Sequence, residues 1–87
     1  MKTKAHVVLY TKTDCSLCDK MREQMALATC DDLYTLEEVD IEKDAALFAR
    51  YRYEIPVLCI DGVEAFRYRL KAGEFRAYLT SLAHNQA

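Results

Sequence analysis

Two cysteines separated by two residues, Cys15 and Cys18, are the strongest chemical signal in the chain. One helical turn brings the Cα atoms of such a pair close enough for a disulfide, so the pair can cycle between dithiol and disulfide. The same spacing occurs in half of a zinc site, and a buried structural pair has it as well. The spacing alone therefore indicates redox, metal or structural use without choosing among them.

The position of the pair in the chain favours redox chemistry. Cys15 follows a β-prone run and a polar turn and precedes an amphipathic helix, so we expect it at the N-cap. There, the backbone N–H groups of Leu17 and Cys18 and the helix dipole favour a thiolate, and Lys12 adds a full charge. The carboxylate of Asp14 opposes these effects, so we predict that the Cys15 pKa is lowered and give no size for the shift. Cys15 would attack a substrate disulfide, and the more buried Cys18 would resolve the mixed disulfide.

The first half of the chain predicts a strand, a helix and a second strand. The apolar run at 5–10 is typical of a central strand covered on both faces by helices. The segment 33–40 is rich in β-formers and in carboxylates, which favours a strand at the sheet edge. Between them, 16–29 predicts a helix. Its expected buried stripe is Leu17, Met21, Met25 and Ala28.

The second half predicts a short helix, a hairpin and a closing helix. Asp44 is a good N-cap for a helix through Tyr51, and 57–60 is a second apolar run expected to be a central strand. Asp61-Gly62 predicts a type I′ turn into a returning strand at 63–68. A last amphipathic helix should cover the sheet. The stripes expected on the two helices are Leu47, Phe48 and Tyr51, and then Phe75, Tyr78, Leu79 and Leu82.

The element order β-α-β-α-β-β-α predicts one α/β domain over residues 1–87. Its mixed four-stranded sheet should have the order 2-1-3-4, with helices on both faces. The chain is 52% hydrophobic and 30% charged, which fits a soluble domain, and its net charge of −2 argues against nucleic-acid and membrane partners. The early apolar stretch is too short for an export signal, so we expect a cytoplasmic protein, where cysteines indicate chemistry rather than structural bridges.

Nearly the whole chain resembles glutaredoxins, and more closely the short bacterial glutaredoxin-like proteins with a thioredoxin-like fold. The resemblance rests on 10–18, on Val39-Asp40-Ile41 and on Glu54-Ile55-Pro56-Val57. It implies a three-layer α/β/α fold and a thiol–disulfide oxidoreductase with Cys15 and Cys18 as its catalytic cysteines.

The resemblance also implies a substrate site. In the family, the peptide bond before the proline is cis and lies against the active-site disulfide, which implies the same for Ile55–Pro56. The N–H and C=O of Ile55 would then pair with an extended substrate. Lys12 would hold a carboxylate of glutathione. Where the family has a Gly-Gly pair for the γ-glutamyl end, Glu64 to Arg69 reads Glu-Ala-Phe-Arg-Tyr-Arg, which argues against the usual glutathione site. Glutathione stays a candidate co-substrate, and we expect no other cofactor.

The remaining reactive or charged residues have simpler interpretations. Cys59 is expected to be a small hydrophobe within its strand, and His6 a strand residue. Cys30 is expected to be a bystander at a helix end, with a surface thiol open to glutathionylation as the alternative. The Arg/Tyr runs at 50–53 and 67–69 predict a solvated face with partly buried tyrosines, or else a patch that grips an anionic substrate.

Three functions stay open. The leading hypothesis is a monomeric enzyme that reduces disulfide-containing proteins or glutathione mixed disulfides, recharged by glutathione or by a reductase. The first alternative is a noncatalytic thioredoxin-like module whose pair is a redox sensor or a stabilising bridge. The other is metal handling, although no second pair of spaced ligands accompanies the two cysteines and we predict no metal site.

Overall fold

The computed structural model describes residues 4–85, with side chains up to residue 83. The element order confirms the predicted one, with short 3-10 turns at Asp31–Leu33 and Ile41–Lys43. No helix in the described range is long and apolar enough to span a bilayer. The helices and strands are β1 (Ala5–Thr11), α1 (Ser16–Leu27), β2 (Tyr34–Asp40), α2 (Ala45–Tyr51), β3 (Val57–Ile60), β4 (Val63–Arg67) and α3 (Ala72–Asn85).

The four strands form one mixed sheet in the order β2-β1-β3-β4, as the sequence predicted. β1 pairs with β2 in parallel, from Ala5 opposite Tyr34 to Thr11 opposite Asp40. β3 runs antiparallel to both β1 and β4. The parallel pair follows from the β1-α1-β2 crossover, and the antiparallel pair β3-β4 follows from the tight turn that joins them. β2 is an edge strand, as its carboxylates indicated.

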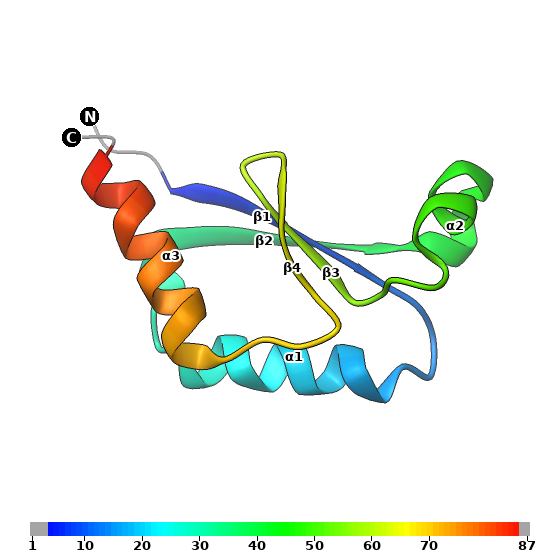
Figure 1. The fold of residues 1–87 in the computed structure, drawn as a ribbon, viewed down its shortest axis with the longest axis horizontal. Coiled ribbons are helices and arrows are strands. Elements are labelled where there is room, and N and C mark those ends of the chain that lie inside the picture. Colours follow the sequence, from blue (N-terminus) through cyan, green and yellow to red (C-terminus); the bar gives the residue numbers. More distant parts are fainter. Residues whose placement is uncertain (1–3, 86–87) are drawn as a thin grey trace.

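The main core lies between the sheet and the two longer helices. α1 and α3 cover the same face of the sheet, with α3 crossing near the start of β1 (Figure 1). The stripe predicted on α3 is confirmed, since Phe75 and Leu79 are fully buried and Tyr78 and Leu82 are partly buried against them. The fully or nearly fully buried residues that β1, α1 with its C-cap, and β3 add to this core are Ala5, Val7, Leu9, Met21, Met25, Ala28, Leu58 and Ile60.

The opposite face of the sheet is only partly covered. β1 alternates along its length, with Val7 and Leu9 buried, His6 exposed and Val8 and Tyr10 between these extremes. Helices lie on both faces of the sheet, as predicted, but they cover the second face of β1 only in part. The reason is the length of α2, whose seven residues lie at one end of the sheet, so that Val8 and Tyr10 join the buried cluster on this face and His6 stays exposed (Figure 1).

The helical stripes also need two corrections. Leu17 keeps 38% of its surface exposed, and Cys18 instead joins Met21 and Met25 on the buried side of α1. A helix that begins at Ser16 places positions i, i+3 and i+7 on one face, which leaves Leu17 beside that face. On α2, Phe48 is 36% exposed and lies under the Arg52 guanidinium, 5.7 Å from its ring centroid.

The predicted helix cap and hairpin are both present. Asp44 caps α2, its Oδ1 accepting the backbone N–H groups of Ala46 and Leu47 at 2.9 and 3.1 Å. Asp61 and Gly62 have φ angles of 51° and 83°, the positive values that a type I′ turn needs. Asp61 also accepts the backbone N–H of His6 at 2.8 Å, which ties the hairpin to β1.

Candidate active site

Cys15 and Cys18 form a disulfide at the start of α1. Cys15 is the N-cap, with extended backbone angles of φ −110° and ψ 104°, and the two Cα atoms are 5.2 Å apart. The Cys15 sulfur accepts the backbone N–H of Cys18 at 3.1 Å. Of the two N–H donors expected from the sequence, Leu17 and Cys18, the structure shows the second. The N-cap position of Cys15, from which the redox argument started, is confirmed.

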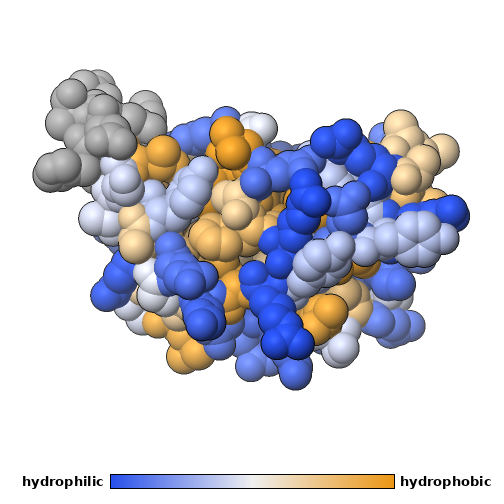
Figure 2. Space-filling view, viewed as in Figure 1, coloured by the Kyte–Doolittle hydropathy of each residue, from blue (hydrophilic) through white to orange (hydrophobic). Residues whose placement is uncertain are grey.

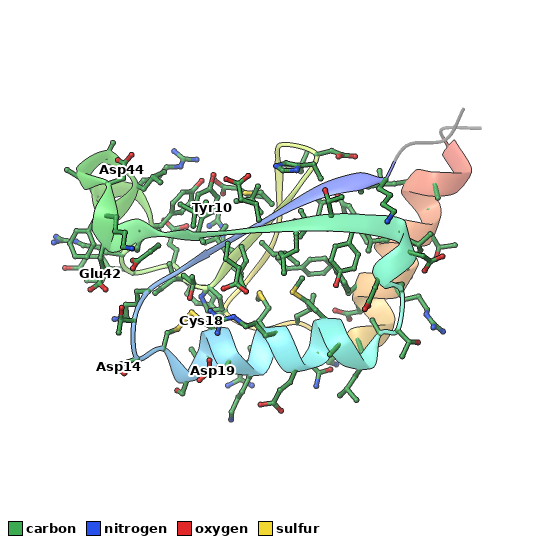
Figure 3. The ribbon with its side chains drawn as sticks, turned by 180° about the vertical axis from the view of Figure 1, so that it is seen from behind. Tyr10, Asp14, Cys18, Asp19, Glu42 and Asp44 are labelled. Atoms are coloured by element: carbon green, nitrogen blue, oxygen red, sulfur yellow. A yellow bond between two sulfur atoms is a disulfide. The ribbon has the colours of Figure 1, made fainter. Side chains whose placement is uncertain are left out.

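The two sulfurs differ in their access to solvent. Cys18 is fully buried on the side of α1 that faces the sheet, whereas Asp19 lies on the outer side (Figure 3). Cys15 is only partly buried. A disulfide that approaches from solution therefore meets Cys15 before Cys18, which is the order that the sequence predicted for the nucleophile and the resolving thiol.

The loop before Cys15 carries one positive and one negative side chain. Lys12 and Asp14 are both exposed, and Asp14 has a positive φ of 57°, a conformation that short polar residues tolerate. The backbone N–H of Thr13 donates to Glu42, which ties this loop to the turn that follows β2. The structure thus places Lys12 in the loop that leads to the nucleophile, and its role stays a prediction.

The segment before β3 packs beside the disulfide. The Ile55–Pro56 peptide is cis, as the resemblance implied, and Ile55 lies in the same buried cluster as Cys15 and Cys18. The backbone N–H of Ile55 donates to the carbonyl of Tyr51 at 3.1 Å. This N–H therefore has a partner within the chain, whereas the pairing of the Ile55 backbone with a substrate stays a prediction.

A hydrogen-bond network around the Glu64 carboxylate, which the sequence did not reveal, joins α2 to β4. Glu64 accepts hydrogen bonds from the Tyr51 hydroxyl at 2.8 Å and from the Arg50 guanidinium at 2.7 Å, and it pairs with Arg67. These donors lower the pKa of Glu64 from about 4.5 to about 2. The Tyr51 ring stacks on Tyr10, with centroids 4.6 Å apart. The network fixes α2 against β4.

The network also shows what most arginines of the Arg/Tyr runs at 50–53 and 67–69 contact. Arg50 and Arg67 are held by Glu64, and Arg67 also pairs with Glu54. Arg52 lies 4.6 Å from the ring centroid of Tyr53. These arginines lie on a solvated face, as the simpler of the two interpretations predicted. Arg69 is the exception, because it faces a groove. The tyrosines are not partly buried as expected, because Tyr51 is 6% exposed whereas Tyr53 and Tyr68 are 79% and 46% exposed.

The two other cysteines are buried and free. Cys59 is 8% exposed in the middle of β3, as predicted, and burial raises the pKa of its thiol. Cys30 is 3% exposed, so the alternative of a surface thiol is wrong, and burial, with a smaller contribution from Asp31 and Asp32, raises its pKa. The described side chains bring no three His, Cys, Asp or Glu residues together as metal ligands.

A groove of about 440 Å³ begins at Leu17, between the two cysteines, and runs between α1 and the segment that joins β4 to α3. Sequence reasoning missed it because its two walls are far apart in the chain. The amide of Gln24 joins the walls, accepting the backbone N–H of Ala72 at 3.0 Å. We call it the α1 groove; its lining residues are Leu17, Lys20, Met21, Glu23, Gln24, Tyr68, Arg69, Leu70 and Lys71.

A mixed four-stranded sheet, a cysteine pair at the start of the first helix and a cis proline after Ile55, which shares a buried cluster with that pair, define a thioredoxin-like protein. Residues 6–80 match the glutaredoxin-like domain family (DUF836), and the chain belongs to that family.

Relatives and solved structures agree with this assignment. The glutaredoxin-like protein YDR286C homolog of Dictyostelium discoideum is 26% identical over 87 residues, covering 93% of this chain and 81% of the relative. The structure of the protein XcR50 from X. campestris is 32% identical with a TM-score of 0.74, covering 86% of this chain and 96% of that one. A mutant thioredoxin from Halobacterium salinarum has a TM-score of 0.64 at 14% identity, covering 93% and 76%, and supports the fold alone.

Proposed function

We propose that the protein is a thiol–disulfide oxidoreductase that reduces disulfide-containing proteins or glutathione mixed disulfides. The observation that carries the proposal is the Cys15–Cys18 disulfide, with a partly exposed sulfur at the helix N-cap and a buried sulfur one turn on. The glutaredoxin-like family and the name of the glutaredoxin-like relative support the same class of reaction.

The reaction consists of two exchanges. The Cys15 thiolate attacks one sulfur of the substrate disulfide, a mixed disulfide forms, and the first substrate thiolate leaves. Cys18 then loses its proton and attacks the Cys15 sulfur, which forms the intramolecular disulfide and releases the second substrate thiolate. Each of the two released substrate thiolates then takes up one proton, so the substrate disulfide ends as two thiols. The substrate gains two electrons, and the protein passes from dithiol to disulfide.

The starting dithiol is restored by a thiol donor. Two molecules of a small thiol such as glutathione, or one dithiol reductase, reduce the Cys15–Cys18 bond and are themselves oxidised to a disulfide. The cycle needs no other cofactor.

Two further groups have proposed roles in binding. The carbonyl of Ile55 lies in the segment beside the disulfide and can accept an N–H from an extended substrate backbone. The ammonium group of Lys12 favours the Cys15 thiolate and attracts a substrate carboxylate. Lys12→Ala should therefore slow the first exchange, and it should do so more at low than at high ionic strength.

Turnover of a peptide–glutathione mixed disulfide in the presence of excess glutathione tests the proposal. We expect turnover by the intact protein and its loss in Cys15→Ser, where serine keeps a side-chain cap on α1. Cys18→Ser should accumulate a covalent adduct on Cys15 when it is given a protein disulfide. Cys30→Ser is the matched control and should retain turnover, because Cys30 is buried away from the pair.

Absence of turnover in the intact protein, together with an empty trap in Cys18→Ser, would contradict the proposal. The noncatalytic module would then be the better description of the chain.

A further inference from the structure

The α1 groove carries an excess of positive charge. Lys20, Arg69 and Lys71 line it together with a single carboxylate, Glu23, which leaves a surplus of two positive charges. The ion pairs among the described residues involve none of these three cations. The surplus stands out because the whole chain has a net charge of −2. A cationic surface without internal partners favours an anionic ligand.

The end of the groove nearest the disulfide is apolar and exposed. Leu17, between the two cysteines, is 38% exposed, and Tyr68 is 46% exposed. Tyr68 is held in place, because its backbone N–H donates to the carbonyl of Pro56 at 2.8 Å and its hydroxyl donates to the carbonyl of Tyr53 at 3.3 Å. The groove is thus built onto the segment that packs beside the disulfide. This apolar end is therefore the part of the groove nearest to a substrate that reacts with Cys15.

Figure 2 shows the polarity of the face that carries β4. In Figure 2, hydrophilic residues run down the middle of the visible face over β4 and the segment that follows it, beside apolar surface towards α3. Charged and apolar side chains therefore adjoin one another along this side of the molecule.

We propose that the α1 groove binds an acidic segment of a protein substrate, next to the cysteine that Cys15 attacks. The substrate cysteine would be flanked by an apolar residue that covers Leu17 and Tyr68 and by carboxylates that pair with Lys20, Arg69 and Lys71. This inference rests on the proposed function and specifies its substrate class.

The shape and chemistry of the groove favour a protein segment over a small thiol compound. Large apolar side chains on both sides of the entrance gain free energy only when an apolar surface covers them, at about 25 cal/mol per Å². Three separate cations spread over two elements, α1 and the segment before α3, match carboxylates spaced along a chain. Glutathione offers no large apolar side chain for the entrance.

The test uses the reduced protein and three disulfides. Two are peptides of equal length with a Leu beside the cysteine, one with Glu and one with Lys at the flanking positions, each carrying a 2-mercaptoethanol cap on its sulfur. The third is bis(2-hydroxyethyl) disulfide, which is neutral and too small to fill the groove. The measured quantity is the rate of the first exchange for each peptide, divided by the rate with the small disulfide.

We expect the intact protein to react faster with the acidic peptide than with the basic one, and rising salt to reduce the difference. Arg69→Glu and Lys71→Glu should each lower the acidic-to-basic ratio by about 3- to 10-fold, the size of one or two weak surface charge pairs. Lys4→Glu is the matched control. It changes the net charge equally but lies before β1, at the opposite end of that strand from the Cys15 loop, so the ratio should stay the same.

An unchanged ratio in both groove variants would overturn the inference, and so would an equal fall in Lys4→Glu. Glutathione disulfide is added as a fourth disulfide for comparison, and a faster reaction with it than with the acidic peptide would overturn the inference in favour of a small-thiol site. Failure of the proposed function looks different, because the intact protein would then not react even with the small neutral disulfide.

Discussion

Reduction of the Cys15–Cys18 bond should destabilise the protein by at most about 2 kcal/mol. The bond closes a ring of only four residues, from Cys15 to Cys18. In the chain-entropy description, a ring of this size removes about 6 cal/mol/K from the unfolded chain, which is about 2 kcal/mol at 25 °C. Small domains commonly have an unfolding free energy of about 5–15 kcal/mol, so the reduced protein should stay folded.

The structure argues for a cost below this limit. The main core between the sheet, α1 and α3 includes neither of the two bridged cysteines. In the oxidised state the Cys15 sulfur accepts the backbone N–H of Cys18, and a Cys15 thiolate would accept it more strongly once the bond is open. The stronger hydrogen bond at the helix cap therefore offsets part of the stability lost with the disulfide.

Urea unfolding with and without a phosphine reductant at pH 7 measures the difference. With an m-value of about 1 kcal/mol/M, the midpoint should fall by about 2 M or less. A double variant with both Cys15→Ser and Cys18→Ser is the control, and its midpoint should not respond to the reductant because Cys30 and Cys59 are free thiols.

A much larger loss would refute this reasoning. If the reduced protein lost about 4 kcal/mol or more, or failed to fold, the bond would be a structural staple. The noncatalytic stabilising bridge would then explain the pair better than a redox cycle.

Three other predictions concern the scaffold. Phe75→Ala should cost about 3–5 kcal/mol in urea unfolding, because Phe75 is fully buried, whereas Val63→Ala at an exposed site should cost less than about 0.5 kcal/mol. Asp44→Ala should cost about 1 kcal/mol, and Asp44→Asn much less, since asparagine can still cap α2. The Glu64 pKa falls from about 4.5 to about 2 on folding, so its stabilisation is present above pH 4.5 and is lost as pH falls towards 2. Glu64→Gln should therefore lose less stability than the intact protein between pH 4.5 and 2, and an equal loss in both would contradict the assigned cause.

The sequence predicted the elements well where one periodic pattern decided them. The apolar run in β3 and the Asp61-Gly62 turn specify a strand and a hairpin through local backbone preferences. The parallel pairing of β1 and β2 followed from the helical crossover between them, and the pairing of β3 and β4 from their tight turn. These signals act over short stretches of chain, so a single sequence suffices to detect them.

Burial on individual faces was less predictable. Leu17 and Phe48 are apolar and lie close to the buried stripes of their helices, yet they are exposed. Which of two neighbouring positions faces inward depends on how the helix is rotated against the sheet, and the packing of distant residues sets that rotation. The open face of β1 has a similar origin, because periodicity in β1 does not report the short length of α2.

The sequence likewise predicted some features of the candidate site and not others. The position of Cys15 at the helix N-cap could be predicted, because the strand, loop and helix that place it are adjacent in sequence. The Glu64 network and the α1 groove could not, because Tyr51 with Glu64 and Lys20 with Lys71 are brought together only by tertiary packing. The hydrogen bond that occupies the Ile55 N–H was also missed, since an unbonded N–H and a bonded one look alike in sequence.

The most direct test of the account is the rate of alkylation of Cys15 by iodoacetamide as a function of pH. Cys18→Ser in the reduced state leaves Cys15 as the accessible thiol, because Cys30 and Cys59 are buried, and a variant that also carries Cys15→Ser gives the background. The account predicts a rate that follows a titration clearly below the pKa of an ordinary cysteine, about 8.5. A thiol that still titrates at or above that value would contradict the claim that the helix terminus holds Cys15 as a thiolate.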